Sequence, residues 1–234
     1  MTEFSVILAL RPEAAPAAVR RSLPHAEPRA AQPTDDRFRR LLNHSDWESL
    51  PPAVRARFSC HVGDGEQRTF VGAVVRTVHS RLGYCLAQLA RLVGGPLPHT
   101  PGATGPSTVT VTRDDALGGQ IWTRTYARPG RLPQTINSVK RFAGPTGLEE
   151  FLGHGLLMRL TLAVENGALV FRSAGYDIQI AGRRIALPRA LTPGNCTISH
   201  RDLGDGRFSF TLTLDHALFG RLLEQVAIYQ EITP

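Results

Sequence analysis

The segment LLMRLTLAVENGALVFRSAGYDIQIAGRRIALP, residues 156–188, decides the fold class of this chain. Its apolar residues recur at every second position in runs that end at tight turns, which is the pattern of half-buried strands. Asn166-Gly167 is the dipeptide that a type I′ hairpin turn favours, and Ala181-Gly182 marks a second tight turn. The segment therefore predicts an antiparallel β-meander.

Strands of the same kind surround this meander. The expected strands cover residues 67–79, 107–114, 119–127, 134–144 and 196–215, the last being a hairpin. Within that hairpin, Phe208, Phe210, Leu212 and Leu214 alternate with polar residues, which predicts a sheet with one buried and one solvated face. The final stretch, residues 216–234, fits both a helix and a strand, and the two alternatives stay open.

Helical patterns occur mainly before the strands. The first expected helix begins at Thr34 or Asp35 and ends at Asn43, because these residue types cap or terminate helices. A second begins at Pro51-Pro52, where the missing N–H of proline costs nothing. Leucine spacing predicts a third over residues 82–94.

The coarse organisation follows from these elements. Residues 1–33, rich in Ala, Pro and Arg, predict an N-terminal arm or linker, and residues 34–234 predict a single β-rich domain. An antiparallel sheet of this size curls or closes. We therefore predict an α+β, β-rich fold: a strongly curved or closed antiparallel sheet, lipocalin-like or helix-grip-like, with N-terminal helices. A sheet of this kind encloses a pocket for a ligand.

Composition restricts the class of partner and the compartment. The 234 residues carry a net charge of +7, and Lys140 is the only lysine, so the positive charge is almost entirely arginine. The arginines are scattered and no nucleic-acid-binding motif accompanies them, so we do not expect nucleic acid as a partner. The three cysteines are widely spaced without a CxxC pair, which fits a reducing cytoplasm. No apolar run approaches the ~20 residues that span a bilayer, so we expect a cytoplasmic chain without a transmembrane segment.

Motifs for familiar catalytic machinery do not occur. The sequence lacks GxSxG, HExxH, a Walker loop and GxGxxG. Its eight histidines never pair at metal-ligand spacing, and adjacent carboxylates such as Glu149-Glu150 fit caps and solvated loops. We therefore expect no metal and no cofactor, and catalytic residues stay unknown.

A candidate binding face lies in GGQIWTRTYARPG, residues 118–130. In a strand, Trp122, Arg124 and Tyr126 share one face. The opposite face is less apolar, so we predict that these three side chains point inward. A buried arginine needs a partner, and two alternatives stay open: a protein carboxylate or the anionic group of a ligand.

Arg159 and Tyr176 are further candidates. Arg159 lies on a mixed strand face that either lines a cavity or meets solvent. Gly175 marks a bulge that re-aims Tyr176. The candidate ligand-binding residues are Trp122, Arg124, Tyr126, Arg159 and Tyr176.

The order of several motifs resembles one bacterial family. These motifs are LLNHSDWESLPPAVRARF, GGPLP, IWTRTY, LLMRLTLAVENGALVFRSAGY, GRRIALP, and GRFSFTLTL followed by LFGRL. From Asp35 to the C-terminus the chain is similar to DUF 4166, a domain of unknown function. Members stand alone or follow a reductase resembling saccharopine dehydrogenase, and some are attached to membrane segments. The family's closing strand, Leu-x-x-Tyr-x-Gly, is replaced here by LLEQVAIYQE at residues 222–231. The resemblance supplies no reaction and implies a reductase as a candidate partner.

Three functions fit such a container. The leading hypothesis is binding of a hydrophobic small molecule with an anionic or carbonyl end, which Arg124 would hold while Trp122, Tyr126 and Tyr176 pack on its body. The alternative is a biosynthetic enzyme, a cyclase or isomerase acting on a polyketide- or terpenoid-like substrate in the same pocket. The second alternative is an interaction module for a reductase partner. Whether the chain is an enzyme stays open.

Overall fold

The computed structural model describes residues 34–116 and 118–232. Its helices are η1 (Arg39–Leu41), α1 (His44–Ser49), α2 (Pro52–Ser59), α3 (Arg81–Ala90), η2 (Arg91–Val93) and η3 (Arg189–Leu191). Its strands are β1 (Gln67–His79), β2 (Gly105–Asp114), β3 (Gly119–Tyr126), β4 (Gln134–Arg141), β5 (Glu149–Gly153), β6 (Leu156–Glu165), β7 (Ala168–Ile180), β8 (Arg183–Ala186), β9 (Asn195–Gly204), β10 (Arg207–His216) and β11 (Gly220–Ile232). The predicted arm, residues 1–33, lies outside the described residues, so the predicted domain boundary stays a prediction.

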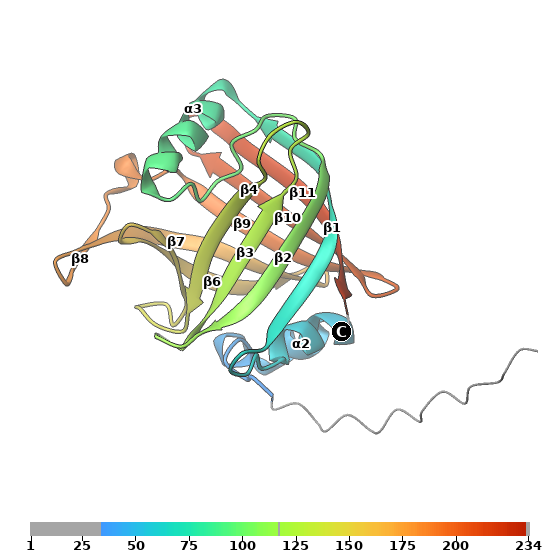
Figure 1. The fold of residues 1–234 in the computed structure, drawn as a ribbon. Coiled ribbons are helices and arrows are strands. Elements are labelled where there is room, and N and C mark those ends of the chain that lie inside the picture. Colours follow the sequence, from blue (N-terminus) through green and yellow to red (C-terminus); the bar gives the residue numbers. More distant parts are fainter. Residues whose placement is uncertain (1–33, 117, 233–234) are drawn as a thin grey trace, which may run out of the picture. The chain divides into compact units, whose positions relative to one another are not determined.

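The strands close into an antiparallel barrel (Figure 1). Their order is β6-β5-β4-β3-β2-β1-β11-β10-β9-β7, and β6 also pairs with β7 along Leu156–Glu165, which closes the ring. β8 lies outside the ring, paired with the end of β7. The predicted closed, β-rich antiparallel sheet with N-terminal helices is confirmed.

Local turn chemistry fixes the hairpin register. Asn166 and Gly167 have φ values of 49° and 73°, so both adopt the left-handed conformation that a type I′ turn requires. The bulge predicted at Gly175 is also present, since Arg159 pairs with Gly175 whereas Leu160 pairs with Ser173. Ala174 is the extra residue of this bulge.

The structure revises two sequence-based expectations about the ends of the domain. The helix predicted from Thr34 or Asp35 to Asn43 is wrong, because only the short turn η1 forms there. Asn43 instead begins α1, where its side chain accepts the N–H of Asp46 at 2.7 Å. Within the ambiguous C-terminal stretch, residues 220–232 form the strand β11, which lies between β1 and β10 and completes the barrel.

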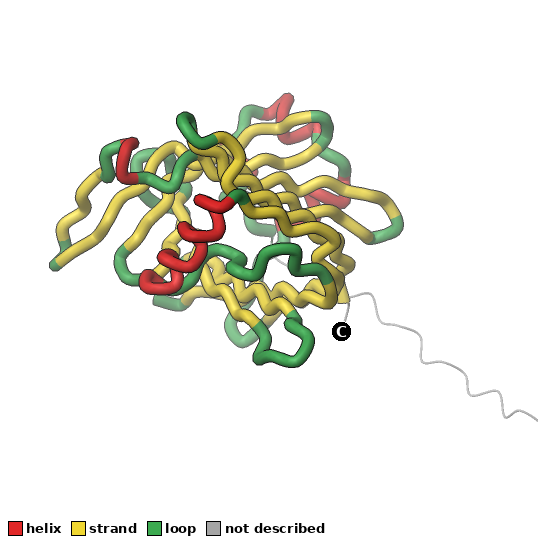
Figure 2. The backbone as a smooth tube through the Cα atoms, turned by 90° about the horizontal axis from the view of Figure 1, so that it is seen from above, coloured by secondary structure: helices red, strands yellow, loops and turns green. Residues whose placement is uncertain are grey.

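The helices lie at opposite ends of the barrel. α1 and α2 close one end, where Trp47, Leu50 and Val54 are buried in the main core cluster. α3 lies across the other end, which Figure 2 shows from above. The strand connections at the α3 end are residues 80–104, 127–133, 154–155, 181–194 and 217–219, and we call this the mouth end.

Gly83 allows α3 to seat on the barrel. Ser80 caps α3 by accepting the N–H of Gly83, and the Ser80 N–H donates to the carbonyl of Leu222 in β11. A Cβ added at Gly83 would lie 1.8 Å from that same carbonyl oxygen. Only glycine therefore permits this approach between helix and strand.

We expect Gly83→Ala to lower the free energy of unfolding by about 1–3 kcal/mol, because the backbone of β11 cannot yield to the new methyl group. This effect opposes the gain of about 1 kcal/mol that alanine gives an unhindered helix. Thermal unfolding measures it, with Cys85→Ala at an exposed site of the same helix as control. An unchanged or raised melting temperature for Gly83→Ala would show that α3 does not pack this closely.

Candidate ligand-binding site

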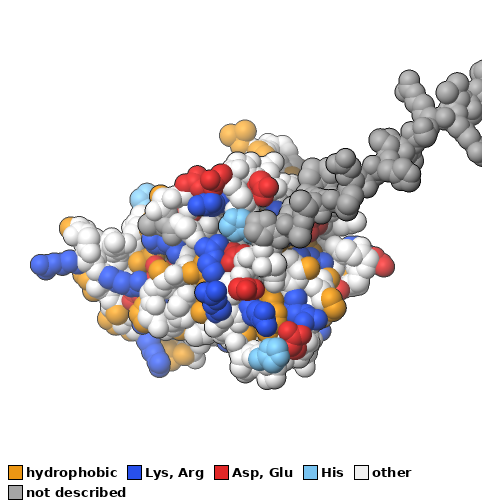
Figure 3. Space-filling model, turned by 90° about the horizontal axis from the view of Figure 1, so that it is seen from below, with side chains coloured by type: hydrophobic (Ala, Val, Ile, Leu, Met, Phe, Trp, Pro, Cys, Tyr) orange, Lys and Arg blue, Asp and Glu red, His pale blue; other side chains and the backbone are white. Residues whose placement is uncertain are grey.

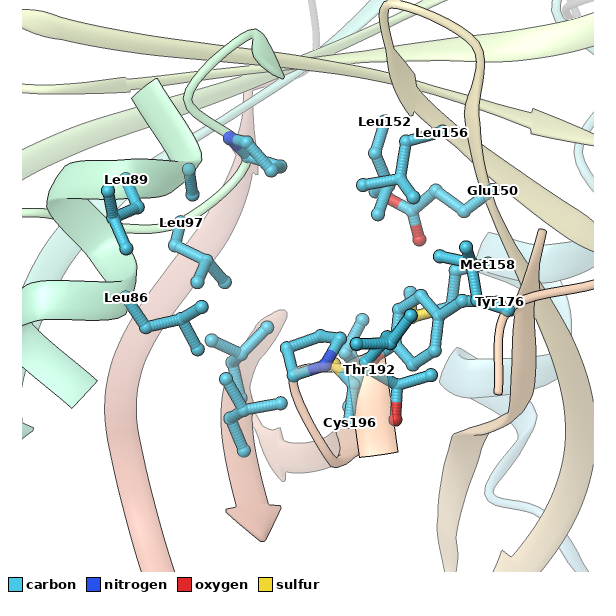
Figure 4. A pocket seen from close by; sticks show the side chains of 18 of the residues that line it. Leu86, Leu89, Leu97, Glu150, Leu152, Leu156, Met158, Tyr176, Thr192 and Cys196 are labelled. Atoms are coloured by element: carbon cyan, nitrogen blue, oxygen red, sulfur yellow. The ribbon is translucent and has the colours of Figure 1, made fainter. Parts of the chain in front are cut away.

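One half of the barrel interior is an apolar cavity of about 360 Å³ (Figure 4). Leu86, Leu89 and Leu97 line it from α3 and the loop after it, and Leu152, Leu156 and Met158 line it from β5 and β6. Further walls come from the segment before β9 and from β9 and β10, with Leu187, Ala190, Leu191, Thr192, Pro193, Cys196, Ile198, Leu212 and Leu214. This volume lies at the lower end of the range of about 300–1,000 Å³ that is usual for small-molecule sites.

The other half of the interior is filled by side chains. Phe70 and Phe208 meet edge to face with ring centroids 5.3 Å apart, and Tyr229 packs beside them. Only a gap of about 20 Å³ remains there. Arg124 borders both this gap and the large cavity, so its side chain lies where the packed half gives way to the open half.

β3 presents its mixed face to the interior, as predicted. Gln120, Arg124 and Tyr126 are buried, and Arg124 is only 7% exposed. Trp122 packs between the two core clusters. The inward orientation of this face is therefore confirmed, while its contact with a ligand stays a proposal.

A buried polar network surrounds the guanidinium of Arg124. Its Nη2 donates to Oγ of Ser138 on β4 and lies 3.4 Å from Oε1 of Glu150 on β5. The hydroxyl of Ser138 donates to the same Glu150 oxygen. Nζ of Lys140 donates to the other, Oε2, at 3.1 Å. Lys140 and Glu150 are directly opposite on paired strands, so the register of β4 and β5 sets this contact.

The charges of this network do not cancel. Two basic side chains, Arg124 and Lys140, share the single carboxylate of Glu150, so one positive charge is in excess when Lys140 is protonated. Arg124 also holds a buried Nε with no hydrogen-bond partner among the described residues. A buried donor and an unbalanced charge are both costly. Arg124 and Glu150 line the cavity, and we call this charged part of its wall the floor.

The environment fixes the charge state of Glu150. Burial by itself raises the pKa of this carboxyl, but the charges of Lys140 and Arg124 outweigh that effect and lower the pKa to about 2. Burial lowers the pKa of Lys140, and Arg124 adds to this, whereas Glu150 opposes it. Glu150 is thus ionised at neutral pH and serves as the counter-ion of the two cations.

Two other polar groups on the cavity wall are neutral. Burial raises the pKa of the Tyr176 hydroxyl above its ordinary value of 10.0. Burial, reinforced by the charge of Glu150, raises the pKa of the Cys196 thiol to about 12. A thiol that holds its proton is a weak nucleophile, so this wall offers hydrogen-bonding groups and apolar surface rather than reactive anions.

The structure separates the five predicted residues. Arg124 and Tyr176 line the cavity. Trp122 borders the small gap instead of the cavity, with Nζ of Lys140 4.6 Å from its ring centroid, and Tyr126 packs in the filled half. Arg159 lies apart in a surface cleft of about 620 Å³, where its Nε is 3.5 Å from Oδ2 of Asp177.

Ser138, Lys140 and Glu150 are the functional candidates that sequence reasoning missed. The expectation that Glu149-Glu150 belongs to a cap or a solvated loop is wrong, because both residues are buried in β5. One signal was available: Lys140 is the single lysine of an arginine-rich chain, and it follows Ser138 at the two-residue spacing of one strand face.

Within the described ranges, no three His, Cys, Asp or Glu side chains gather in a way that could hold a metal ion. Nor does any helix in this part of the chain combine the length and apolar character needed to cross a bilayer.

Fold and site together define a small β-barrel protein with an internal apolar cavity and a charged floor. The chain belongs to the family described as a domain of unknown function (DUF4166), whose model matches residues 50–227. Among solved structures, a mutant of the fluorescent protein UnaG is 14% identical, with 71% of this chain and 95% of that chain covered and a TM-score of 0.30. A similarity at this level carries no functional argument. No curated protein matches the chain.

Replacing Glu150 by Gln should lower the free energy of unfolding by about 3–5 kcal/mol at neutral pH, because two cations then stay buried without a counter-ion. Urea unfolding measures this loss. Glu165→Gln is the control, since Glu165 and Arg172 form an exposed pair with side chains 41% and 46% accessible. Breaking that pair should cost less than about 1 kcal/mol.

The pH dependence of the stability of wild type and Glu150→Gln gives a second test of the buried ion network. The pKa of Glu150 is about 2 in the folded chain against an ordinary value of 4.5, so its carboxylate stabilises the fold above pH 4.5. That contribution is lost as the pH falls toward 2. The gap in unfolding free energy between the wild type and Glu150→Gln should therefore narrow over this interval. A gap that stays constant would contradict the buried ion network.

Proposed function

We propose that the cavity binds a hydrophobic small molecule whose anionic or carbonyl end contacts Arg124. The observation that carries this proposal is that Arg124, a buried cation, lines an otherwise apolar cavity while it shares the single carboxylate of Glu150 with Lys140. A ligand carboxylate or carbonyl would accept from this guanidinium and offset the charge, while the apolar walls would cover the ligand body. Tyr176 would contact the ligand, and Trp122 and Tyr126 would support the floor from behind.

The protonation states support binding over proton transfer. General acid–base catalysis is most effective when a group has a pKa near the working pH. Glu150 has a pKa of about 2, and the pKa values of Tyr176 and Cys196 are raised, so each keeps a single protonation state near neutral pH. A cyclase or isomerase in the same pocket is the alternative, and it would have to act mainly by shape and by polarising a carbonyl at Arg124.

The proposals for the cellular compartment and for a protein partner have less support than the ligand-binding proposal. The thiols of Cys85 and Cys196 are free, which supports the bacterial cytoplasm as the proposed location. A reductase partner rests on the family resemblance alone.

Arg124→Met tests the proposal. Methionine removes the excess charge and leaves Lys140 paired with Glu150, so the variant should fold. We expect its affinity for parinaric acid, a fluorescent fatty acid, to fall about 10- to 100-fold, the value of a hydrogen bond to a charged group. The affinity for parinaric acid methyl ester, which carries no charge, should change less. Fluorescence titration measures both.

Arg172→Gln is the matched control, because Arg172 forms an exposed pair with Glu165 and does not line the cavity. It should bind both probes as the wild type does. Equal binding of the acid by wild type and Arg124→Met would overturn the proposed role of Arg124. Failure of the folded wild type to bind either probe would overturn the proposed cavity function.

A further inference from the structure

The large apolar side chains that are at least half exposed gather at the mouth end. They lie on the connections of that end or at strand positions next to them: Leu82, Leu89, Leu92, Leu132, Ile180, Ile185, Leu191, Leu218 and Phe219. Leu92 and Leu132 are 77% and 83% exposed. At the opposite end, Leu203 is a large apolar residue with 42% exposure. Concentrated exposed apolar surface of this kind marks an interaction site.

The mouth end also carries basic side chains, and its connections contain no acidic residues to balance their charge. Its connections, residues 80–104, 127–133, 154–155, 181–194 and 217–219, contain no Asp or Glu. They carry exposed arginines that form no ion pair within the described part of the chain: Arg81, Arg91, Arg131, Arg183 and Arg189. Carboxylates are instead present at the opposite end, where acidic and basic side chains intermingle (Figure 3). The charge of the barrel is therefore polarised along its axis.

This surface is continuous with the opening of the cavity. Leu89 and Leu191 line the cavity and are also 64% and 72% exposed. Arg91 follows Leu89 by two residues, and Arg189 precedes Leu191 by two. The apolar and basic groups thus frame the place where a hydrophobic ligand would enter or leave.

We propose that the mouth end docks onto an anionic lipid bilayer. Its apolar side chains come from four separate connections with unpaired arginines between them, so they fit a broad interface in which leucines enter the acyl region and arginines meet phosphates. A protein partner or a second copy would need a complementary acidic surface. Docking would place the cavity opening against the lipid, so that a hydrophobic ligand passes between bilayer and barrel without crossing water. The docking goes beyond the ligand-binding proposal and does not require it.

Vesicle flotation with the full chain tests the docking. We expect binding to vesicles that mix phosphatidylglycerol with phosphatidylcholine, and much weaker binding to phosphatidylcholine alone. Raising the salt from about 0.1 M to 1 M shortens the Debye length from about 10 Å to about 3 Å and should weaken the binding. The double variant Leu92→Asp/Leu132→Asp should bind at least about tenfold less, because it puts charge into the acyl region.

Matched variants separate the contribution of the arginines to vesicle binding from that of the apolar side chains. Arg91→Gln/Arg189→Gln should lower binding by about tenfold, since each arginine near an anionic surface contributes several-fold. Leu203→Asp and Arg201→Gln/Arg207→Gln change the same residue types at the opposite end and should bind as the wild type does. Parinaric acid titration without vesicles should be unchanged in Leu92→Asp/Leu132→Asp, because neither leucine lines the cavity.

Several results would overturn the docking. These are absence of binding to anionic vesicles, equal binding to neutral ones, or equal losses in the opposite-end variants. If the chain does not bind vesicles but forms a dimer, and Leu92→Asp/Leu132→Asp dissociates that dimer, the surface would be assigned to self-association. Loss of parinaric acid binding alone, with vesicle binding retained, would count against the cavity function and leave the docking in place.

Discussion

The ion pair between Lys140 and Glu150, extended by Ser138 to Arg124, is the constraint around which the barrel interior is arranged. Closure through β6 and β7 leaves these charged groups almost without access to water. Charges in such a place must be paired and hydrogen-bonded. The register of β4 and β5 places Lys140 directly opposite Glu150, and Ser138, two residues earlier on β4, connects Glu150 to Arg124 on β3. The carboxylate of Glu150 thereby receives donors on both oxygens.

This arrangement divides the interior. On one side of Arg124 the rings of Phe70, Phe208 and Tyr229 fill the barrel, and on the other side leucines leave a cavity. A polar floor below apolar walls gives a ligand a direction, because only one of its ends can meet the guanidinium. The network sets two basic side chains against one carboxylate, and this imbalance is the physical basis of the ligand-binding proposal.

The two ends of the barrel differ for a related reason. Helices α1 and α2 cover one end and bury Trp47, Leu50 and Val54 in the main core cluster of the barrel, and carboxylates accompany the arginines around that end. At the mouth end α3 lies across the opening and leaves leucines on both its cavity side and its outer side. The exposed leucines of this helix belong to the surface that we propose docks onto lipid.

Period-two patterning and turn chemistry were enough, in the sequence by itself, to determine the antiparallel meander, the bulge at Gly175 and the inward face of Arg124. These are local properties, set by alternation along a strand and by which residues accept positive φ. The sequence could not determine that residues 220–232 form β11, because the gap between β1 and β10 that makes this stretch a strand exists only once the barrel closes. Nor could it show that Glu150 is buried beside Lys140, or that Arg159 borders a surface cleft instead of the cavity. Those facts depend on which strands become neighbours, and strand pairing across long separations is decided by tertiary structure.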